Sequence, residues 1–195
     1  EDPWVLKHIH LHVRAGQSVA LVGRTGSGKS TMVSLLQKLY DYEQGEIELD
    51  GQPLRNIALS ELRQRVGVVQ QDPFLFRGTI ASNISLSSPQ IFEGQIEKSA
   101  QAAHLDSLLK RCRHGLHTEI QESGANLSVG ERQLIAFARV LAFDPDILIL
   151  DEATANVDSV SEVLIQKATE QITKGRTSLI VAHRLSTIQN CNQIV

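Results

Sequence analysis

The sequence has 195 residues, of which 42% are hydrophobic and 21% are charged, so a folded core is expected and intrinsic disorder is excluded. A net charge of −3 disfavours a surface built to bind nucleic-acid phosphates. The longest apolar run, 134–138, is far shorter than the about 18 residues of a membrane-spanning helix. Cys112 and Cys191 form neither a disulfide framework nor a CxxC metal pair, which fits a reducing cytosol.

Strand and helix patterns alternate along most of the chain. Strand-like patterns occupy residues 5–13, 18–22, 46–50, 66–70, 147–150 and 178–182. Helical patterns cover 29–40, 60–65 and 159–172, and the stretch 72–145 is mostly helical, with no convincing strand. This alternation predicts a parallel α/β core made of 1–71 and 146–195, with a small antiparallel sheet near the N-terminus and an inserted α-helical subdomain over about 72–145.

A glycine-rich loop follows the second strand and opens the first helix. It fits GxxxxGK[ST] in the strand-to-helix context that gives this motif its meaning, so the accidental glycine-rich turn is the weaker interpretation. Its backbone N–H groups and the helix N-terminus favour phosphate, the lysine reaches the β- and γ-phosphates, and the serine hydroxyl ligates Mg²⁺. The expected nucleotide-binding residues are Gly23, Arg24, Thr25, Gly26, Ser27, Gly28, Lys29, Ser30 and Thr31.

Two acids end the strand predicted at 147–150. Asp151 leaves the carboxyl end of a fully apolar strand, where a carboxylate of a phosphate-loop protein helps to hold Mg²⁺. Glu152 follows directly and is expected to be the general base that polarises a water for attack on the γ-phosphate. A solvated Asp-Glu strand end is the plainer alternative, and the complete phosphate loop disfavours it.

Five further segments resemble the nucleotide-binding domain of ATP-binding cassette (ABC) transporters, in the order that the family has them. They are the Q-loop glutamine Gln71, the exporter-type X-loop 118–124, the LSGGQ-like signature 127–131 (LSVGE), the D-loop 155–158 and the switch histidine His183. The resemblance covers essentially the whole chain, and it implies a P-loop NTPase with a RecA-like parallel sheet core.

The resemblance also implies what these segments do. Gln71, His183 and Glu152 would be catalytic, and Gln71 would join Ser30 and Asp151 around Mg²⁺. Ser128 and Gly130 would contact the γ-phosphate held by the opposite subunit, and Ser128 and Asp158 would lie at the dimer interface. Plainer interpretations also exist, because Gln71 could end a strand, Asp158 could cap a helix and His183 could be structural.

The signature departs from the family pattern at Val129 and Glu131. Ser128 with Glu131 three residues later forms an S-x-x-E capping box, so the helix start is expected to survive the second change. A carboxylate at Glu131 nevertheless adds negative charge where a phosphate is expected.

The family implies an ATP- and Mg²⁺-dependent ATPase that drives an exporter by ATP-sandwiched, head-to-tail dimerisation. Its partners would be a second ABC ATPase domain and a transmembrane domain, fused or separate, with no nucleic acid. The location would be the cytoplasmic face of a cell membrane, the bacterial inner membrane in particular. Two alternatives are a weakly hydrolysing regulatory half of a heterodimeric exporter and a non-transport ABC-type ATPase.

The ends of the chain carry two further expectations. Residues 193–195 resemble the inside of a strand, so we expect a single ABC ATPase domain, 1–195, truncated at both ends. Trp4 stands closer to the phosphate loop than the family's adenine-stacking aromatic residue, which is expected upstream. His8, His10 and His12 alternate on one strand face, where a solvent-facing row is favoured over a zinc site.

Overall fold

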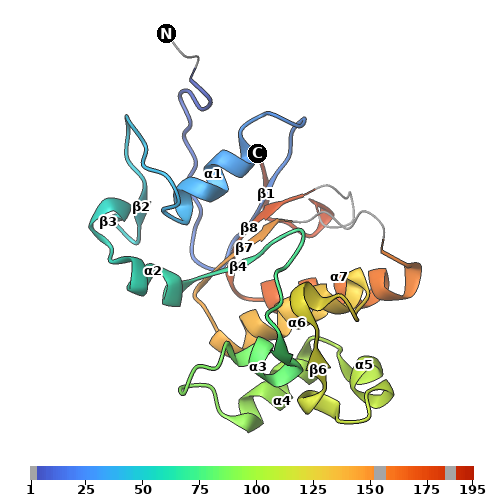
Figure 1. The fold of residues 1–195 in the computed structure, drawn as a ribbon. Helices are drawn as coiled ribbons and strands as arrows, with labels where there is room; N and C mark the ends of the chain where they lie inside the picture. Colours follow the sequence, from blue (N-terminus) through green and yellow to red (C-terminus); the bar gives the residue numbers. More distant parts are fainter. Residues whose placement is uncertain (1–3, 152–156, 183–187) are drawn as a thin grey trace.

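A five-stranded parallel sheet forms the centre of the molecule in the computed structural model, which describes residues 4–151, 157–182 and 188–195 (Figure 1). Its strand order is β4-β7-β8-β1-β9, and every pairing is parallel. The strands are β1 (Ser18–Leu21), β4 (Val66–Val69), β7 (Ile147–Asp151), β8 (Thr177–Val181) and β9 (Gln193–Ile194). The predicted α/β fold with a parallel core is therefore confirmed.

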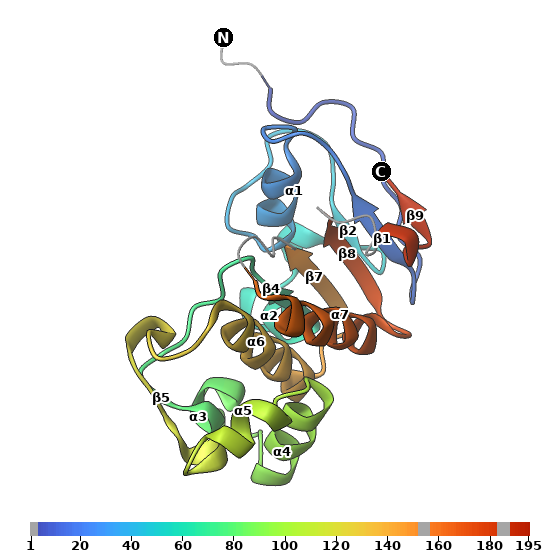
Figure 2. The same ribbon diagram turned by 90° about the vertical axis from the view of Figure 1, so that its right-hand side faces the viewer.

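The alternation of side chains along each strand divides the interior into two cores. In β7, Ile149 packs in a cluster with Val33 of helix α1 (Lys29–Leu36), whereas Leu148 packs in a cluster with helices α6 (Val129–Phe143) and α7 (Ser159–Thr173). Successive side chains of a strand point to opposite faces, so apolar runs such as Ile-Leu-Ile-Leu bury both faces at once. Figure 2 shows the resulting layers, with α1 on one side of the sheet and α6 and α7 on the other.

A mostly helical region packs on the side of α6 that faces away from the sheet. It contains α3 (Ile80–Ser85), α4 (Glu93–Ala102), α5 (Asp106–Arg111), the short turns η2 (Gly115–His117) and η3 (Glu122–Gly124), and the two-residue strands β5 (Gly78–Thr79) and β6 (Glu119–Ile120). The antiparallel β5–β6 pair corrects the expectation that this stretch holds no strand. Two residues per strand are too few for an alternating pattern to be visible in the sequence.

Arg139 of α6 forms hydrogen bonds with this region. Its guanidinium donates hydrogen bonds to the backbone carbonyls of Asn83, at 2.9 Å, and Phe74, at 3.2 Å. Burial lowers the pKa of Arg139 from its ordinary value, because desolvation disfavours the charged form. The helical region is therefore attached to the core through backbone groups as well as apolar packing.

The segment 5–13 does not form the strand that its pattern predicts. His8 has a positive φ of 52°, which interrupts an extended run, and no residue of 5–13 lies in a strand. Leu11 and Val13 still pack against the cluster beneath α1, which accounts for their apolar character. The small antiparallel sheet of the N-terminal half is instead the hairpin β2 (Glu48–Leu49) and β3 (Gln52–Pro53).

Other helices differ from the predictions mainly at their ends. Helix α1 ends at Leu36 and not at 40, because Lys38 adopts a positive φ of 54°. Helix α2 (Leu59–Arg65) follows the short turn η1 (Leu54–Asn56), close to its predicted range. The longest described helices, α6 and α7, have 15 residues each, and no helix in the described ranges is both long and apolar enough for a membrane crossing.

Candidate nucleotide-binding site

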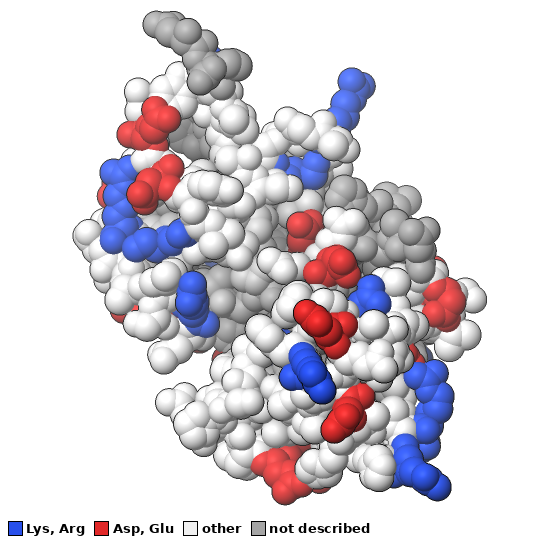
Figure 3. Space-filling model, viewed as in Figure 1, with Lys and Arg blue, Asp and Glu red and all other residues white. Residues whose placement is uncertain are grey.

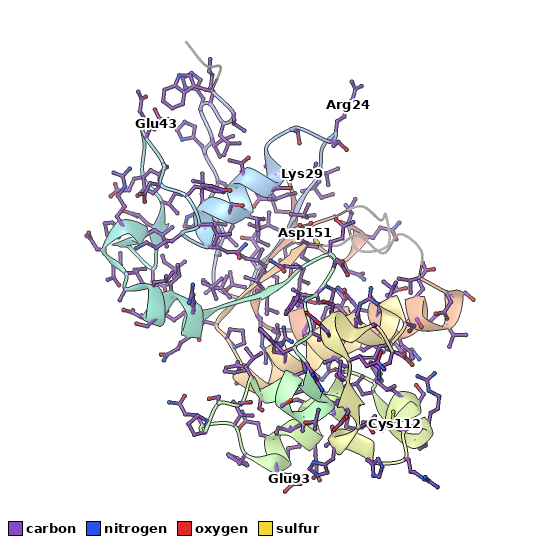
Figure 4. The ribbon with its side chains drawn as sticks, in the orientation of Figure 1. Arg24, Lys29, Glu43, Glu93, Cys112 and Asp151 are labelled. Atoms are coloured by element: carbon purple, nitrogen blue, oxygen red, sulfur yellow. The ribbon has the colours of Figure 1, made fainter. Side chains whose placement is uncertain are left out.

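Three of the predicted motifs meet at the carboxyl edge of the parallel sheet. Strand β1 leads into the phosphate loop at Gly23, β4 leads to Gln71, and β7 ends at Asp151. Because the strands are parallel, their carboxyl ends lie at one edge, which is where α/β proteins bind ligands. Figure 4 shows Lys29 and Asp151 on this side of the sheet, while the Arg24 side chain points away into solvent.

The phosphate loop leaves the first turn of α1 without a capping side chain. Gly28 is the N-cap residue, with a left-handed φ of 92°, and it supplies no side-chain hydrogen bond. No acidic residue stands in the first turn. The first N–H groups of a helix need an acceptor, and the positive end of the helix dipole favours an anion there.

Lys29 lies folded over the loop that precedes it. Its ammonium group donates to the carbonyl oxygens of Gly23, at 2.7 Å, and Arg24, at 3.0 Å, and approaches the Ser27 hydroxyl at 3.3 Å. The charge is thereby held over the loop, where a bound phosphate would exchange some of these contacts for its own oxygens. The phosphate-contacting role of Lys29 stays a prediction.

Two glycines of the loop lie close to neighbouring side chains. A Cβ at Gly23 would lie 2.6 Å from the Ser27 Oγ, and a Cβ at Gly28 would lie 2.6 Å from Cδ2 of Leu6. The second contact shows that the segment before β1 packs directly against the loop. A side chain at position 23 would require the Ser27 side chain to move, and any residue other than glycine at position 28 would also be strained by the φ of 92°.

The oxygen ligands predicted for Mg²⁺ come from this same edge. Ser30 is exposed in the first turn of α1, Gln71 is exposed after β4, and Asp151 is half-buried at the end of β7. Hydroxyl, amide and carboxylate oxygens are hard ligands of the kind that Mg²⁺ prefers, so the donor set fits the ion. Glu152 and His183 lie outside the described residues.

The three N-terminal histidines are not gathered into a cluster in the described part of the chain. Within the described ranges, no group of three His, Cys, Asp or Glu side chains could hold a metal ion, and His8, His10 and His12 are all exposed. The positive φ of His8 also breaks the alternation that would have placed the three imidazoles on one face.

The predicted capping box forms at the start of α6. The Ser128 Oγ accepts a hydrogen bond from the N–H of Glu131, at 3.2 Å, and the Glu131 carboxylate accepts one from the N–H of Ser128, at 2.9 Å. The change to glutamate in the signature therefore preserves the helix start, as predicted.

Gly130 lets the signature helix approach the helix that follows the D-loop. A Cβ at Gly130 would lie 2.5 Å from the Cβ of Ser161 in α7. Asp158 is the N-cap of α7 and accepts hydrogen bonds from the N–H groups of Val160, at 3.1 Å, and Ser161, at 2.9 Å. The pKa of Asp158 lies below its ordinary value, chiefly because of hydrogen bonds from Ser161.

Two contacts tie α6 to the segment after β4. The Arg132 guanidinium pairs with Asp72 at 3.4 Å, and the Gln133 side-chain amide donates to the carbonyl of Gln70 at 3.5 Å. No sequence motif indicates the contact of Arg132, or that of Arg111, which pairs with Glu131 at 2.6 Å. Each pair joins residues far apart in the chain, and local patterns do not reveal such contacts.

The chain is similar to known proteins over its whole length. The family model described as ABC transporter matches residues 6–155. The chain is 49% identical over its whole length to a probable multidrug resistance ABC transporter ATP-binding/permease protein of Bacillus subtilis, covering 29% of that protein. It is 48% identical over its whole length to the ATP-dependent lipid A-core flippase of Escherichia coli K12, covering 34% of that protein.

A solved structure is similar as well. A bacterial Atm1-family ABC exporter with ATP bound superposes with a TM-score of 0.85 and 38% identity, over 94% of this chain and 32% of that one. The chain thus spans about a third of the length of the proteins that it resembles.

Proposed function

The chain belongs to the ABC transporter family, and we propose that it is the motor domain of an exporter, which binds and hydrolyses ATP to drive transport across a membrane. The observation that carries this proposal is the uncapped phosphate loop, with Lys29 folded over it, at the same sheet edge as Asp151. The similarity to exporters over the whole chain supports the transport role.

Each part of the site has a task in this reaction. The backbone of 23–28 and the first turn of α1 bind the phosphates, and Lys29 neutralises charge on the β- and γ-phosphates. Ser30, Gln71 and Asp151 would hold Mg²⁺, which when bound screens the phosphate charge. Glu152 would take a proton from the attacking water, and His183 would contact the γ-phosphate.

We further propose that a second domain completes the site. Ser128 and Gly130 begin α6, and in the proposed dimer they contact the nucleotide held by the phosphate loop of the other domain. Asp158 stands at the start of α7. Because Gly130 packs closely against Ser161 of α7, the starts of the two helices lie side by side and can form one surface. Two copies arranged head to tail would then enclose two ATP molecules.

A transmembrane domain is the second proposed partner. One relative is named as an ATP-binding/permease protein, and this chain matches about a third of it. We infer that the domain works at the cytoplasmic face of a membrane, either fused to its permease or docked on it. The multidrug and lipid A names belong to the relatives, and the residues described here select neither cargo.

The first prediction tests nucleotide binding at Lys29. Lys29→Ala should remove most of the Mg-ATP affinity, because this ammonium group is the main side-chain charge over the phosphate loop. Calorimetric titration of the protein with Mg-ATP measures the effect. Lys98→Ala, on the exposed face of α4, is the matched control and should bind as the wild type does. Equal affinity in the two variants would contradict the assignment.

A further inference from the structure

The start of α6 carries a negative charge that the proposed function does not require. Glu131 stands three residues after Ser128, which in the proposed dimer faces the γ-phosphate of the other domain. A carboxylate this close to a phosphate raises the energy of the bound state, because like charges repel. The structure shows how this charge is compensated.

Both oxygens of Glu131 have a donor. Oε2 accepts the N–H of Ser128 at 2.9 Å, and Oε1 accepts Nη2 of Arg111 at 2.6 Å. The Glu131 side chain is only 15% exposed, whereas that of Arg111 is 65% exposed. The carboxylate is therefore largely shielded from water, and the guanidinium forms the solvent side of the pair. Charge-assisted hydrogen bonds of this kind are stronger than neutral ones.

Arg111 comes from a different part of the fold. It is the last residue of α5, where the negative end of the helix dipole favours a cation. Lys110, Arg111 and Arg113 are all exposed, and Figure 3 shows basic side chains over the region of α5. Of these three, Arg111 is the one that forms an ion pair within the described part of the chain.

We propose that Arg111 is a positioning residue for the nucleotide held by the opposite domain. It neutralises Glu131 and, through that carboxylate, holds the backbone of Ser128 in the orientation in which the signature meets phosphate. This inference rests on the proposed function. It assigns to α5 a role in the site that no sequence motif indicates.

The pairing is specific to the acid at position 131. In a Glu131→Gln variant, the amide oxygen could still accept the N–H of Ser128, but the amide NH₂ would face the guanidinium, donor against donor. Arg111 should therefore matter when residue 131 is glutamate and lose its importance in the Glu131→Gln background.

The experiment measures Mg-ATP hydrolysis by the full-length protein, with its transmembrane domain, as a function of Mg-ATP concentration. In Arg111→Ala we expect KM to rise at least about fivefold, the lower end of the usual coupling between sites, with a smaller change in kcat. Arg111→Lys should recover part of this loss. Arg111→Ala combined with Glu131→Gln should behave like Glu131→Gln alone, and Arg113→Ala should behave like the wild type.

Several outcomes would overturn the proposal. One is an equal effect of Arg111→Ala and Arg113→Ala, and another is a persistent effect of Arg111→Ala in the Glu131→Gln background. Thermal unfolding shows whether the alanine variant is folded, and Arg111→Gln, which keeps the length and removes the charge, replaces it if it is not. If the wild-type protein hydrolyses no ATP, the proposed function fails and this inference fails with it.

Discussion

Gly130 packs closely against α7, and the proposed function gives it a second role at the nucleotide. The proposed function needs its backbone near a phosphate, and the packing of α6 on α7 needs the absence of its Cβ. The contacted residue, Ser161, also donates to the Asp158 cap, so a shift at Gly130 would reach the D-loop. The two requirements can be separated by experiment, because packing is measurable without nucleotide.

We predict that Gly130→Ala lowers the free energy of unfolding by about 1–3 kcal/mol, the usual cost of overpacking. The new methyl group would lie 2.5 Å from the Ser161 Cβ, so Ser161→Gly in the same chain should restore part of the loss. Urea unfolding without nucleotide measures both values. Gly94→Ala is the matched control, because a Cβ at this α4 position meets no atom within 4 Å.

The control should change stability in the opposite direction. Alanine is favoured over glycine within a helix by about 0.5–1 kcal/mol, so Gly94→Ala should be neutral or stabilising. A Gly130→Ala variant as stable as the wild type would show that α6 and α7 can separate without cost, and that the glycine is present for the phosphate alone.

At the scale of elements, the helices differ in what satisfies the N–H groups of their first turn. Helices α6 and α7 begin with side-chain caps from Ser128 and Asp158, whereas α1 begins with Gly28 and no cap. A capped helix has satisfied part of its own requirement for acceptors, and an uncapped one leaves N–H groups for an anion. Helices α2, α4 and α5 also lack a capping side chain, but each has an acidic residue in its first turn and α1 has none. An anion is therefore expected at the start of α1.

The Asp158 cap gives a prediction that depends on pH. The pKa of Asp158 is lowered in the folded state, so its carboxylate contributes stability above its unfolded pKa of about 3.9, and this contribution is lost as the pH falls through the lower folded value. Asp158→Ala should therefore lower the melting temperature near neutral pH, and the difference from wild type should shrink in acid. Thermal unfolding between neutral pH and acid below the usual carboxyl range measures it.

Asp158→Ser is the matched variant, because a serine hydroxyl also caps a helix but carries no charge. It should retain most of the stability at neutral pH. If Asp158→Ala has the same melting temperature as the wild type at every pH, the hydrogen bonds from Val160 and Ser161 do not stabilise the folded state.

The sequence was sufficient for those elements whose signals are local. Apolar runs predicted β7 and β8, the glycine spacing predicted the phosphate loop, and the S-x-x-E pattern predicted the cap of α6. The strand expected at 5–13 was wrong, because alternation reports which side chains are buried and not whether a partner strand is present. The contacts of Arg111, Arg132 and Arg139 were invisible for the same reason, since each depends on tertiary packing.

At the scale of the whole molecule, the residues proposed to bind nucleotide divide between two surfaces. The phosphate loop, Gln71 and Asp151 lie at the carboxyl edge of the sheet. Ser128 and Asp158 instead stand at the starts of α6 and α7, which cover the face of the sheet opposite to α1. Under the proposed function, each ATP lies between one surface of the first type and one of the second type from another domain. Association and hydrolysis are then separable steps, and a variant that blocks only the second should accumulate in the associated state.

Glu152→Gln is the variant that should have this effect. The substitution keeps size and hydrogen-bonding capacity but removes the general base, and the loss of a positioned base typically costs about 10²–10⁴-fold in rate. Lys29, Ser30 and Asp151 remain, so Mg-ATP should still bind and the ATP-associated dimer should accumulate. The measurement pairs the ATPase rate of the full-length protein with its dimer fraction by size-exclusion chromatography in ATP, and Glu97→Gln, on exposed α4, is the control. Hydrolysis near the wild-type rate would contradict the assignment of Glu152 as the base. Slow hydrolysis by a protein that stays monomeric in ATP would instead place the defect at the Ser128 surface. That result would favour the alternative in which the chain is the regulatory half of a heterodimer.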